Sequence, residues 1–211
     1  MPPKFIFVVG CFAIAVATYF FCKSKRDWLW LTLGLMFTVG ADYFLVVRDM
    51  HLHGVAVFCF AHVCYIFRAL TSRPPEGYHY PWAVSVYKDR FYTDYSRAGK
   101  AVVTYPVLAL IVAIWWVVTN DALILLSGIY AGLFITNIAL TIKFCKINKP
   151  LVLTGLVLFM LCDINVALFN LPRQFNTPVI FPSAFYLIWI FYLPSQLLLS
   201  ASAIAFPKAK E

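Results

Sequence analysis

The chain has 211 residues, of which 63% are hydrophobic and only 12% are charged, and its formal net charge is +8. A soluble domain carries about 25% charged residues, so the composition indicates an integral membrane protein and excludes a soluble globular domain. The positive charge reflects the orientation of the loops, described below, and nucleic-acid binding is not needed to explain it.

A membrane-spanning helix needs about 20 mostly apolar residues, and seven segments of the chain meet that need. In chain order they are 5–22, 28–47, 54–70, 101–118, 122–142, 151–169 and 179–206. Their length, and the lack of strand-like alternation, exclude an outer-membrane barrel. The sequence therefore predicts an all-α, polytopic transmembrane helix bundle of about seven spans, formed as a single domain over residues 1–211.

Lysine and arginine residues divide unequally between the two sides of this bundle. Seven spans leave Lys4, Arg48 and Arg173 on one side and the other fourteen on the opposite side. Cytoplasmic loops carry the excess of positive charge, so we expect the N-terminus outside and the C-terminus inside. The aromatic and basic loop 71–100 is then cytoplasmic. We expect it to be an interfacial anchor, with lipid-headgroup binding as the alternative.

The first predicted span has a second interpretation, as a cleaved signal peptide. Lys4 precedes an apolar stretch that contains the small-residue triplet 15–17. Cleavage there would leave the basic segment 23–26 outside the membrane, against the distribution of positive charge. We therefore interpret the segment as a spanning helix.

Two aspartates lie inside the predicted spans. Of the nine acidic residues, seven fall in predicted loops or tails, whereas Asp42 and Asp163 are embedded in long apolar runs. An ionised carboxylate at bilayer depth costs roughly 2.5–3.5 kcal/mol, so such residues mark candidate functional sites. A helix rise of about 1.5 Å per residue places both, with His62, in one broad layer near the middle of the bilayer. The alternative for each is a protonated, purely structural carboxyl group.

Other polar side chains and the cysteines give weaker signals. Polar residues in the apolar spans include Tyr65, Asn137, Asn165, Tyr192, Ser195 and Gln196. Asn and Gln often hold membrane helices together through hydrogen bonds, which is the alternative to a functional role. The six cysteines form no Cys-x-x-Cys pair, so they indicate neither a disulfide framework nor a zinc site.

Four spans resemble helices of the YhhN-like lysoplasmalogenase family, in the family's order. The matching segments are Gly34–Leu45 (GLMFTVGADYFL), His53–Phe67 (HGVAVFCFAHVCYIF), Gly155–Leu168 (GLVLFMLCDINVAL) and Tyr192–Ser202 (YLPSQLLLSAS). The resemblance implies a multispan membrane enzyme that hydrolyses the vinyl ether bond of lysoplasmalogens. The products would be a fatty aldehyde and a glycerophospho-ethanolamine or -choline.

The chain departs from the family's pattern at several positions. Ala41 replaces the glycine next to the first aspartate, Cys162 replaces the serine before the second, and Ser195 replaces the alanine before the glutamine. The family usually has eight spans, whereas seven are predicted here. These departures bear on the substrate more than on the fold.

The implied chemistry suits the residues. A vinyl ether is cleaved by protonation of its outer alkene carbon, after which water adds to the oxocarbenium ion and the hemiacetal collapses. Asp42 and Asp163 are the predicted catalytic pair, one as acid and one as base. Residues expected to orient water or line the cavity are His62, Tyr65, Tyr192, Gln196 and Asn165. Arg48 and Arg68 are the candidates for the phosphate, and the chemistry requires no metal or other cofactor.

Other functions remain as alternatives. A transporter or lipid translocator could use Asp42 and Asp163 as intramembrane proton or cation sites, with Gly40 or Pro194 breaking a helix nearby. A retinal protein is excluded because residues 179–206 contain no lysine. A non-catalytic membrane protein is a third possibility. The expected partners are a lysophospholipid substrate and membrane lipids, and the expected location is a bacterial inner membrane more than an internal eukaryotic one.

Overall fold

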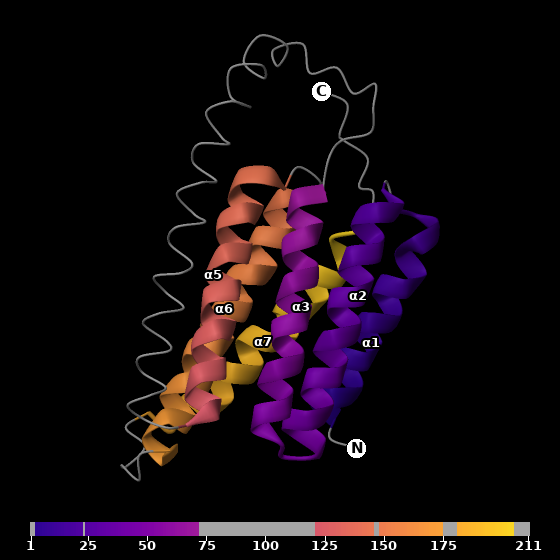
Figure 1. The fold of residues 1–211 in the computed structure, drawn as a ribbon. Helices are drawn as coiled ribbons and strands as arrows, with labels where there is room; N and C mark the ends of the chain where they lie inside the picture. The colour runs from indigo at the N-terminus through magenta and orange to yellow at the C-terminus, as the bar shows by residue number, and fades with distance from the viewer. Residues whose placement is uncertain (1–2, 23, 72–120, 146–147, 175–180, 205–211) are drawn as a thin grey trace, which may run out of the picture.

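The computed structural model describes residues 3–22, 24–71, 121–145, 148–174 and 181–204 (Figure 1). Within these ranges the chain is helical and has no strand, which confirms the all-α prediction. Six helices of the described residues are long and apolar enough to cross a membrane. The predicted span 101–118 and nearly all of the loop 71–100 lie outside the described residues.

The helices coincide with the predicted spans but differ at their ends. The elements are α1 (Pro3–Ala17), the 3-10 helix η1 (Thr18–Phe20), α2 (Lys25–Asp42), the π-helix η2 (Tyr43–Val47), α3 (His51–Thr71), α5 (Ala122–Phe144), α6 (Lys149–Gln174) and α7 (Ala184–Ala201). Polar caps begin two of them. The Ser24 side chain accepts a hydrogen bond from the Asp27 N–H at 3.3 Å, and the Asp121 carboxylate accepts one from the Leu123 N–H at 2.8 Å.

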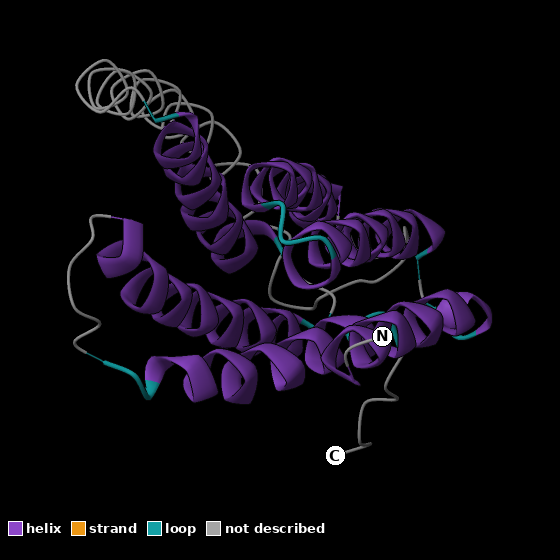
Figure 2. Cartoon of the chain, turned by 90° about the horizontal axis from the view of Figure 1, so that it is seen from below, coloured by secondary structure: helices purple, strands orange, loops and turns teal. Residues whose placement is uncertain are grey.

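The helices form a closed ring of neighbours. In order, α1 packs against α2, α2 against α3, α3 against α5, α5 against α6, α6 against α7, and α7 returns to α1. Figure 2 shows the helices from below, turned by 90° from the view of Figure 1. Consequently α2 and α6, which carry Asp42 and Asp163, are not successive neighbours in the ring. Helix α7 packs against α6 and also touches α2.

The bundle is apolar outside and contains polar groups inside. Large apolar side chains on four helices are strongly exposed, with Ile6, Phe60, Ile135 and Ile190 at 57–60%. By contrast, His62, Asn137 and Gln196 are fully buried. This inversion of the pattern of soluble proteins is the one expected of a multi-pass membrane protein.

A small residue allows the close packing of α2 on α3. A Cβ atom at Gly34 would overlap the ring of Tyr65, because the ring lies directly against the α2 backbone. The Tyr65 hydroxyl lies 3.3 Å from Thr38 Oγ1, one turn further along α2. Gly34 therefore lets the α3 tyrosine lie flat on α2, as small residues do at membrane helix interfaces.

A buried ion pair joins three helices at one end of the bundle, here called the Arg68 end. Arg68 on α3 donates from Nε and Nη2 to the two carboxylate oxygens of Asp27 on α2, at 3.1 and 3.0 Å. Its Nη1 donates to Ser202 Oγ, at the end of α7, at 2.8 Å. The sequence analysis placed Asp27 in a loop. That was wrong: Asp27 lies in the first turn of α2, only 2% exposed, because Arg68 supplies its counter-charge.

Further contacts to the backbone reinforce the Arg68 end. Asn148 adopts a left-handed conformation (φ 47°) just before α6, and its Nδ2 donates to the carbonyls of Ser202 and Ile204 at 2.8 and 2.6 Å. Ile204 also forms an isolated antiparallel bridge with Cys22. The opposite end, where α1, α3, α5 and α7 begin, is called the Arg48 end.

Substitution of Gly34 tests the α2–α3 contact. We expect Gly34→Ala to destabilise the protein by about 1–3 kcal/mol, because the added methyl group displaces the Tyr65 ring. Gly132→Ala is the matched control, since a Cβ atom there meets nothing within 4 Å. Thermal unfolding in detergent should show a lower Tm for Gly34→Ala only, and equal Tm values for the two variants would contradict the packing described.

Substitution of Asp27 tests the buried ion pair. Asp27→Asn leaves the Arg68 guanidinium buried without its counter-charge, which should cost about 3–5 kcal/mol. Asp49→Asn is the control, because the Asp49–His51 pair is exposed, and the Tm should not change. If both variants unfold at the wild-type temperature in detergent, the Asp27–Arg68 pair does not hold this end together.

Candidate functional site

Asp42 is buried at the junction of two kinds of helix. It ends α2, is 4% exposed, and accepts a hydrogen bond at Oδ2 from the hydroxyl of Tyr192 on α7, at 2.5 Å. Directly after it the chain widens into the π-helix η2, in which the Arg48 N–H donates to the Tyr43 carbonyl five residues earlier. Short π segments inside helices often mark functional sites. Two residues that the sequence analysis singled out, Asp42 and Tyr192, are thus in direct contact.

Asp163 forms a second pair of the same type. Its Oδ2 accepts a hydrogen bond from the hydroxyl of Tyr130 on α5, at 2.6 Å. The side chain of Asp163 is half-buried on α6. Each intramembrane aspartate is therefore held by a tyrosine from another helix. The pairing satisfies both carboxyl groups within the protein, as an apolar environment requires.

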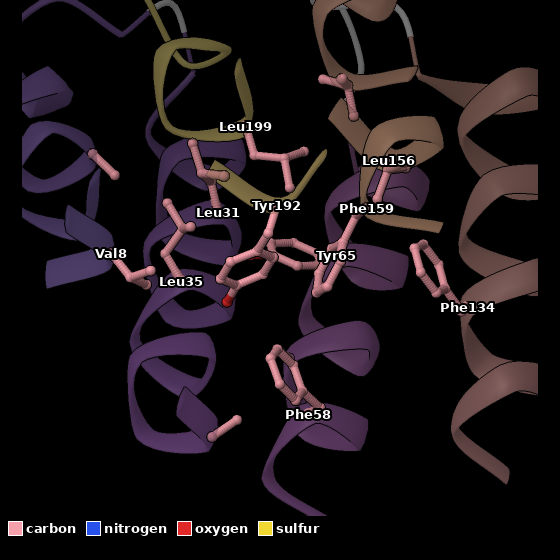
Figure 3. Packing of buried hydrophobic residues seen from close by; sticks show 14 of the residues in the cluster. Val8, Leu31, Leu35, Phe58, Tyr65, Phe134, Leu156, Phe159, Tyr192 and Leu199 are labelled. Atoms are coloured by element: carbon pink, nitrogen blue, oxygen red, sulfur yellow. The ribbon is translucent and has the colours of Figure 1, made fainter. Parts of the chain in front are cut away.

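An aromatic cluster connects the two aspartate–tyrosine pairs. Its members are Phe58, His62, Tyr130, Phe134, Phe159 and Tyr192. Phe159 lies 5.5 Å from Tyr192 and 5.7 Å from Phe58 between ring centroids, and Phe58 lies 6.0 Å from Tyr130. Figure 3 shows Phe159 and Tyr192 together in the core, with Phe58 and Phe134 nearby. The two carboxyl groups thus flank one continuous set of ring contacts.

His62 lies within this cluster and keeps one nitrogen without a partner. Its ring is 4.3 Å from Phe134 and 4.9 Å from Tyr130, centroid to centroid. Asn137 Nδ2 lies 3.4 Å from Nδ1, and the Asn137 carbonyl oxygen accepts from Thr141 Oγ1 at 3.4 Å. Because the amide nitrogen of Asn137 donates, Nδ1 of His62 is the acceptor. The proton of the neutral imidazole ring is therefore on Nε2. The Nε2 atom has no hydrogen-bond partner among the described residues, and its N–H is available to a ligand.

A small cavity lies between the aromatic cluster and the Arg68 end. Its walls are formed by Tyr65, Arg68, Ala69, Asn137, Thr141, Cys145, Val152, Leu156 and Leu199. It leaves about 10 Å³ for the centre of a water-sized sphere, which is room for about one water molecule. Neither aspartate lines it. This mostly apolar cavity lies next to Asn137, the partner of His62.

The other predicted site residues, Tyr65, Gln196 and Asn165, take no part in the two aspartate–tyrosine pairs. Tyr65 contacts Thr38, as described above. Gln196 Nε2 donates to Ser195 Oγ at 3.3 Å, and its Oε1 is buried without a partner among the described residues. Asn165 Nδ2 donates to the Leu161 carbonyl of its own helix at 2.7 Å. Gln196 therefore keeps an unsatisfied acceptor, whereas the amide donor of Asn165 is used within α6.

The two arginines predicted to bind phosphate have different environments. Arg68 is 2% exposed and is held by Asp27 and Ser202. Arg48 is exposed at the end of η2, where its Nε donates to the Tyr43 hydroxyl at 2.9 Å. The positive charge of Arg68 is thus already compensated within the protein, whereas Arg48 has no carboxylate partner among the residues that the structure describes.

Tyr130 is the site residue that the sequence analysis missed. It lies seven residues before Asn137, about two helical turns, so the two share one face of α5. Each contacts a polar side chain of another helix, Asp163 in one case and His62 in the other. This spacing of two polar residues in an apolar span was the signal that could have indicated Tyr130.

Comparison with known proteins gives one match. The model of the YhhN family matches residues 4–203, which is nearly the whole chain. No curated protein matches the chain. No solved structure matches it either.

Isosteric and apolar replacements of the aspartates should differ in stability. Asp42→Asn keeps an oxygen that accepts from Tyr192, so we expect a folded variant with a Tm close to that of the wild type. Asp42→Leu leaves the Tyr192 hydroxyl buried without a partner, which should cost about 1–3 kcal/mol. Thermal unfolding in detergent checks this, and an Asp42→Leu variant as stable as Asp42→Asn would show that the hydrogen bond is not formed.

Proposed function

The chain belongs to the YhhN family, and we propose that it is a membrane-embedded hydrolase that cleaves the vinyl ether bond of lysoplasmalogens. The observation that carries the proposal is the pair of intramembrane aspartates, each held by a tyrosine and both flanking one aromatic cluster. Family membership supports a membrane hydrolase. The substrate bond and the roles of the aspartates are our inference.

The reaction needs one acid and one base. The acid adds a proton to the outer alkene carbon, which creates an oxocarbenium ion at the carbon bonded to the ether oxygen. The base then removes a proton from the water that attacks this carbon. The resulting hemiacetal breaks its bond to the glycerol oxygen, which takes up a proton, and releases the aldehyde. Asp42 and Asp163 divide these proton transfers between them.

The aromatic cluster suits the cationic intermediate and the apolar chain. Ring faces attract positive charge, so the cluster stabilises an oxocarbenium ion between the two aspartates. An ionised carboxylate in the same water-poor site also stabilises the oxocarbenium ion. The Nε2–H of His62 is available to donate to the ether oxygen or to the attacking water. The cavity beside Asn137, the residue that contacts His62, has room for about one water molecule.

A transporter is the second candidate function, and interruptions in two helices favour it. The α-helix of α2 gives way to a π-helix immediately after Asp42, and Pro194 lies inside α7 close to Tyr192. Transporters often place their sites at interrupted helices. The two functions differ in what they need: a hydrolase releases aldehyde in detergent, whereas a transporter requires a sealed membrane.

Replacement of the aspartates tests the hydrolase. We expect detergent-purified wild type to release fatty aldehyde from 1-alkenyl-lysophosphatidylethanolamine. Asp42→Asn and Asp163→Asn should each lower kcat by roughly 10²–10⁴-fold, because each removes one proton-transfer group. Asp49→Asn, an exposed aspartate beyond η2, is the matched control and should keep wild-type kcat.

Two results would contradict this assignment. Wild-type kcat in a folded Asp163→Asn variant would remove Asp163 from the mechanism. A well-folded wild-type protein that releases no aldehyde in detergent, but moves protons or lysolipid across sealed vesicles in an Asp42-dependent manner, would favour the transporter.

A further inference from the structure

Two cations at the Arg48 end, Lys4 and Arg48, take no part in the proposed proton transfers. Lys4 begins α1, and its Nζ lies 3.9 Å from the ring centroid of Trp189 and 4.9 Å from that of Phe185, both on α7. Arg48 lies at the end of η2. No carboxylate of the described residues pairs with either one. The charge of both is thus uncompensated at the rim of an apolar bundle.

The π-helix and one ring contact bring these cations to the same rim. In η2 the residues five positions apart stack along the axis, so Arg48 lies over Tyr43, with its Cζ 5.7 Å from the ring centroid. The Tyr43 ring is in turn 6.2 Å from the ring of Phe5, the residue after Lys4. The Arg48 Nε bonds the Tyr43 hydroxyl, which fixes the guanidinium and leaves its two Nη groups for an anion.

This rim lies within reach of Asp42. Arg48 is six positions after Asp42, at most about 9 Å along the axis at an α-helical rise. Lys4 contacts Trp189, whose ring is 6.0 Å from that of Tyr192, the hydrogen-bond donor to Asp42. In a 1-alkenyl-lysophospholipid the ether oxygen and the phosphorus are separated by three carbons and one oxygen, a little more than one helical turn of roughly 5.4 Å. The Arg48 side chain covers the rest of the axial distance between Asp42 and the phosphate.

We propose that Lys4 and Arg48 form the binding site for the phosphate of a single-chain glycerophospholipid, at the end of the bundle where α1 begins and η2 ends. The proposal rests on the proposed function and specifies its substrate. The phosphate lies at the rim between α1, η2 and α7, and the vinyl ether lies one to two helical turns deeper, beside Asp42. The Arg68 end has no part in substrate binding, because Asp27 already compensates its arginine.

The test compares a phosphate-bearing substrate with an uncharged one. For each variant, kcat/KM is measured in detergent for 1-alkenyl-lysophosphatidylethanolamine and for 1-alkenylglycerol, which has the same vinyl ether without the phosphate. We expect Lys4→Gln and Arg48→Gln each to lower the ratio of the two values about tenfold, mainly through a higher KM for the phospholipid. Lys25→Gln is the matched control, because Lys25 is a cation at the Arg68 end that lies over the Tyr19 ring.

An unchanged ratio in both Lys4→Gln and Arg48→Gln, or an equal fall in Lys25→Gln, would overturn the headgroup site. If the wild type hydrolyses neither substrate, the proposed function fails, and equilibrium binding of lysophosphatidylethanolamine tests the site separately. Weaker binding by Arg48→Gln than by Lys25→Gln then supports the site, and equal binding overturns it. Inorganic phosphate is added as a competitor, and competition at the lipid's own concentration would show a free-anion site instead of a headgroup site.

Discussion

A carboxyl group in a hydrocarbon environment must find its hydrogen-bond partner within the protein, and this constraint organises the whole bundle. Three aspartates of the described residues are placed by it. Asp27 is paired with Arg68, Asp42 with Tyr192 and Asp163 with Tyr130. Each pair joins side chains from two different helices. The polar contacts therefore cross between helices inside the bundle, while the apolar surface faces outward.

The three pairs differ in chemical character. The Asp27–Arg68 pair joins opposite charges in a bidentate contact, a rigid arrangement that suits a structural role. The other two aspartates are bonded only by neutral hydroxyl groups, so their carboxyl groups keep acceptor capacity for a proton, water or substrate. The same residue type is thus structural at the Arg68 end and available for chemistry nearer the Arg48 end.

The two ends of the bundle reflect this division. At the Arg68 end, Asn148 and Ser202 tie the start of α6 and the end of α7 to the rest of the protein. At the Arg48 end, η2 ends in an exposed segment where Asp49 adopts a left-handed conformation (φ 55°). One end is therefore closed by directional contacts, and the other presents cations near Asp42.

The predictions from sequence were most accurate where an interaction is local. Apolar run length located every helix of the described residues, and burial of a lone carboxyl group in such a run singled out Asp42 and Asp163. The errors came from long-range contacts. Asp27 looked like a loop residue because its partner is 41 positions away, and Tyr130 was not singled out because its partner Asp163 is 33 positions away. The π-helix after Asp42 has no local sequence signature.

The sequence by itself determined that the chain is a helical membrane protein and that two carboxyl groups lie at depth in it. Hydropathy, and the free-energy cost of placing a charged group in an apolar span, can both be read from each segment alone. Only the tertiary structure decided what each polar group contacts. It paired Arg68 with Asp27, left Arg48 without a carboxylate partner in the described part of the chain, and gave each deep aspartate a tyrosine partner. Those outcomes depend on which helices become neighbours, and that is set by packing at positions such as Gly34 and by pairing between distant residues.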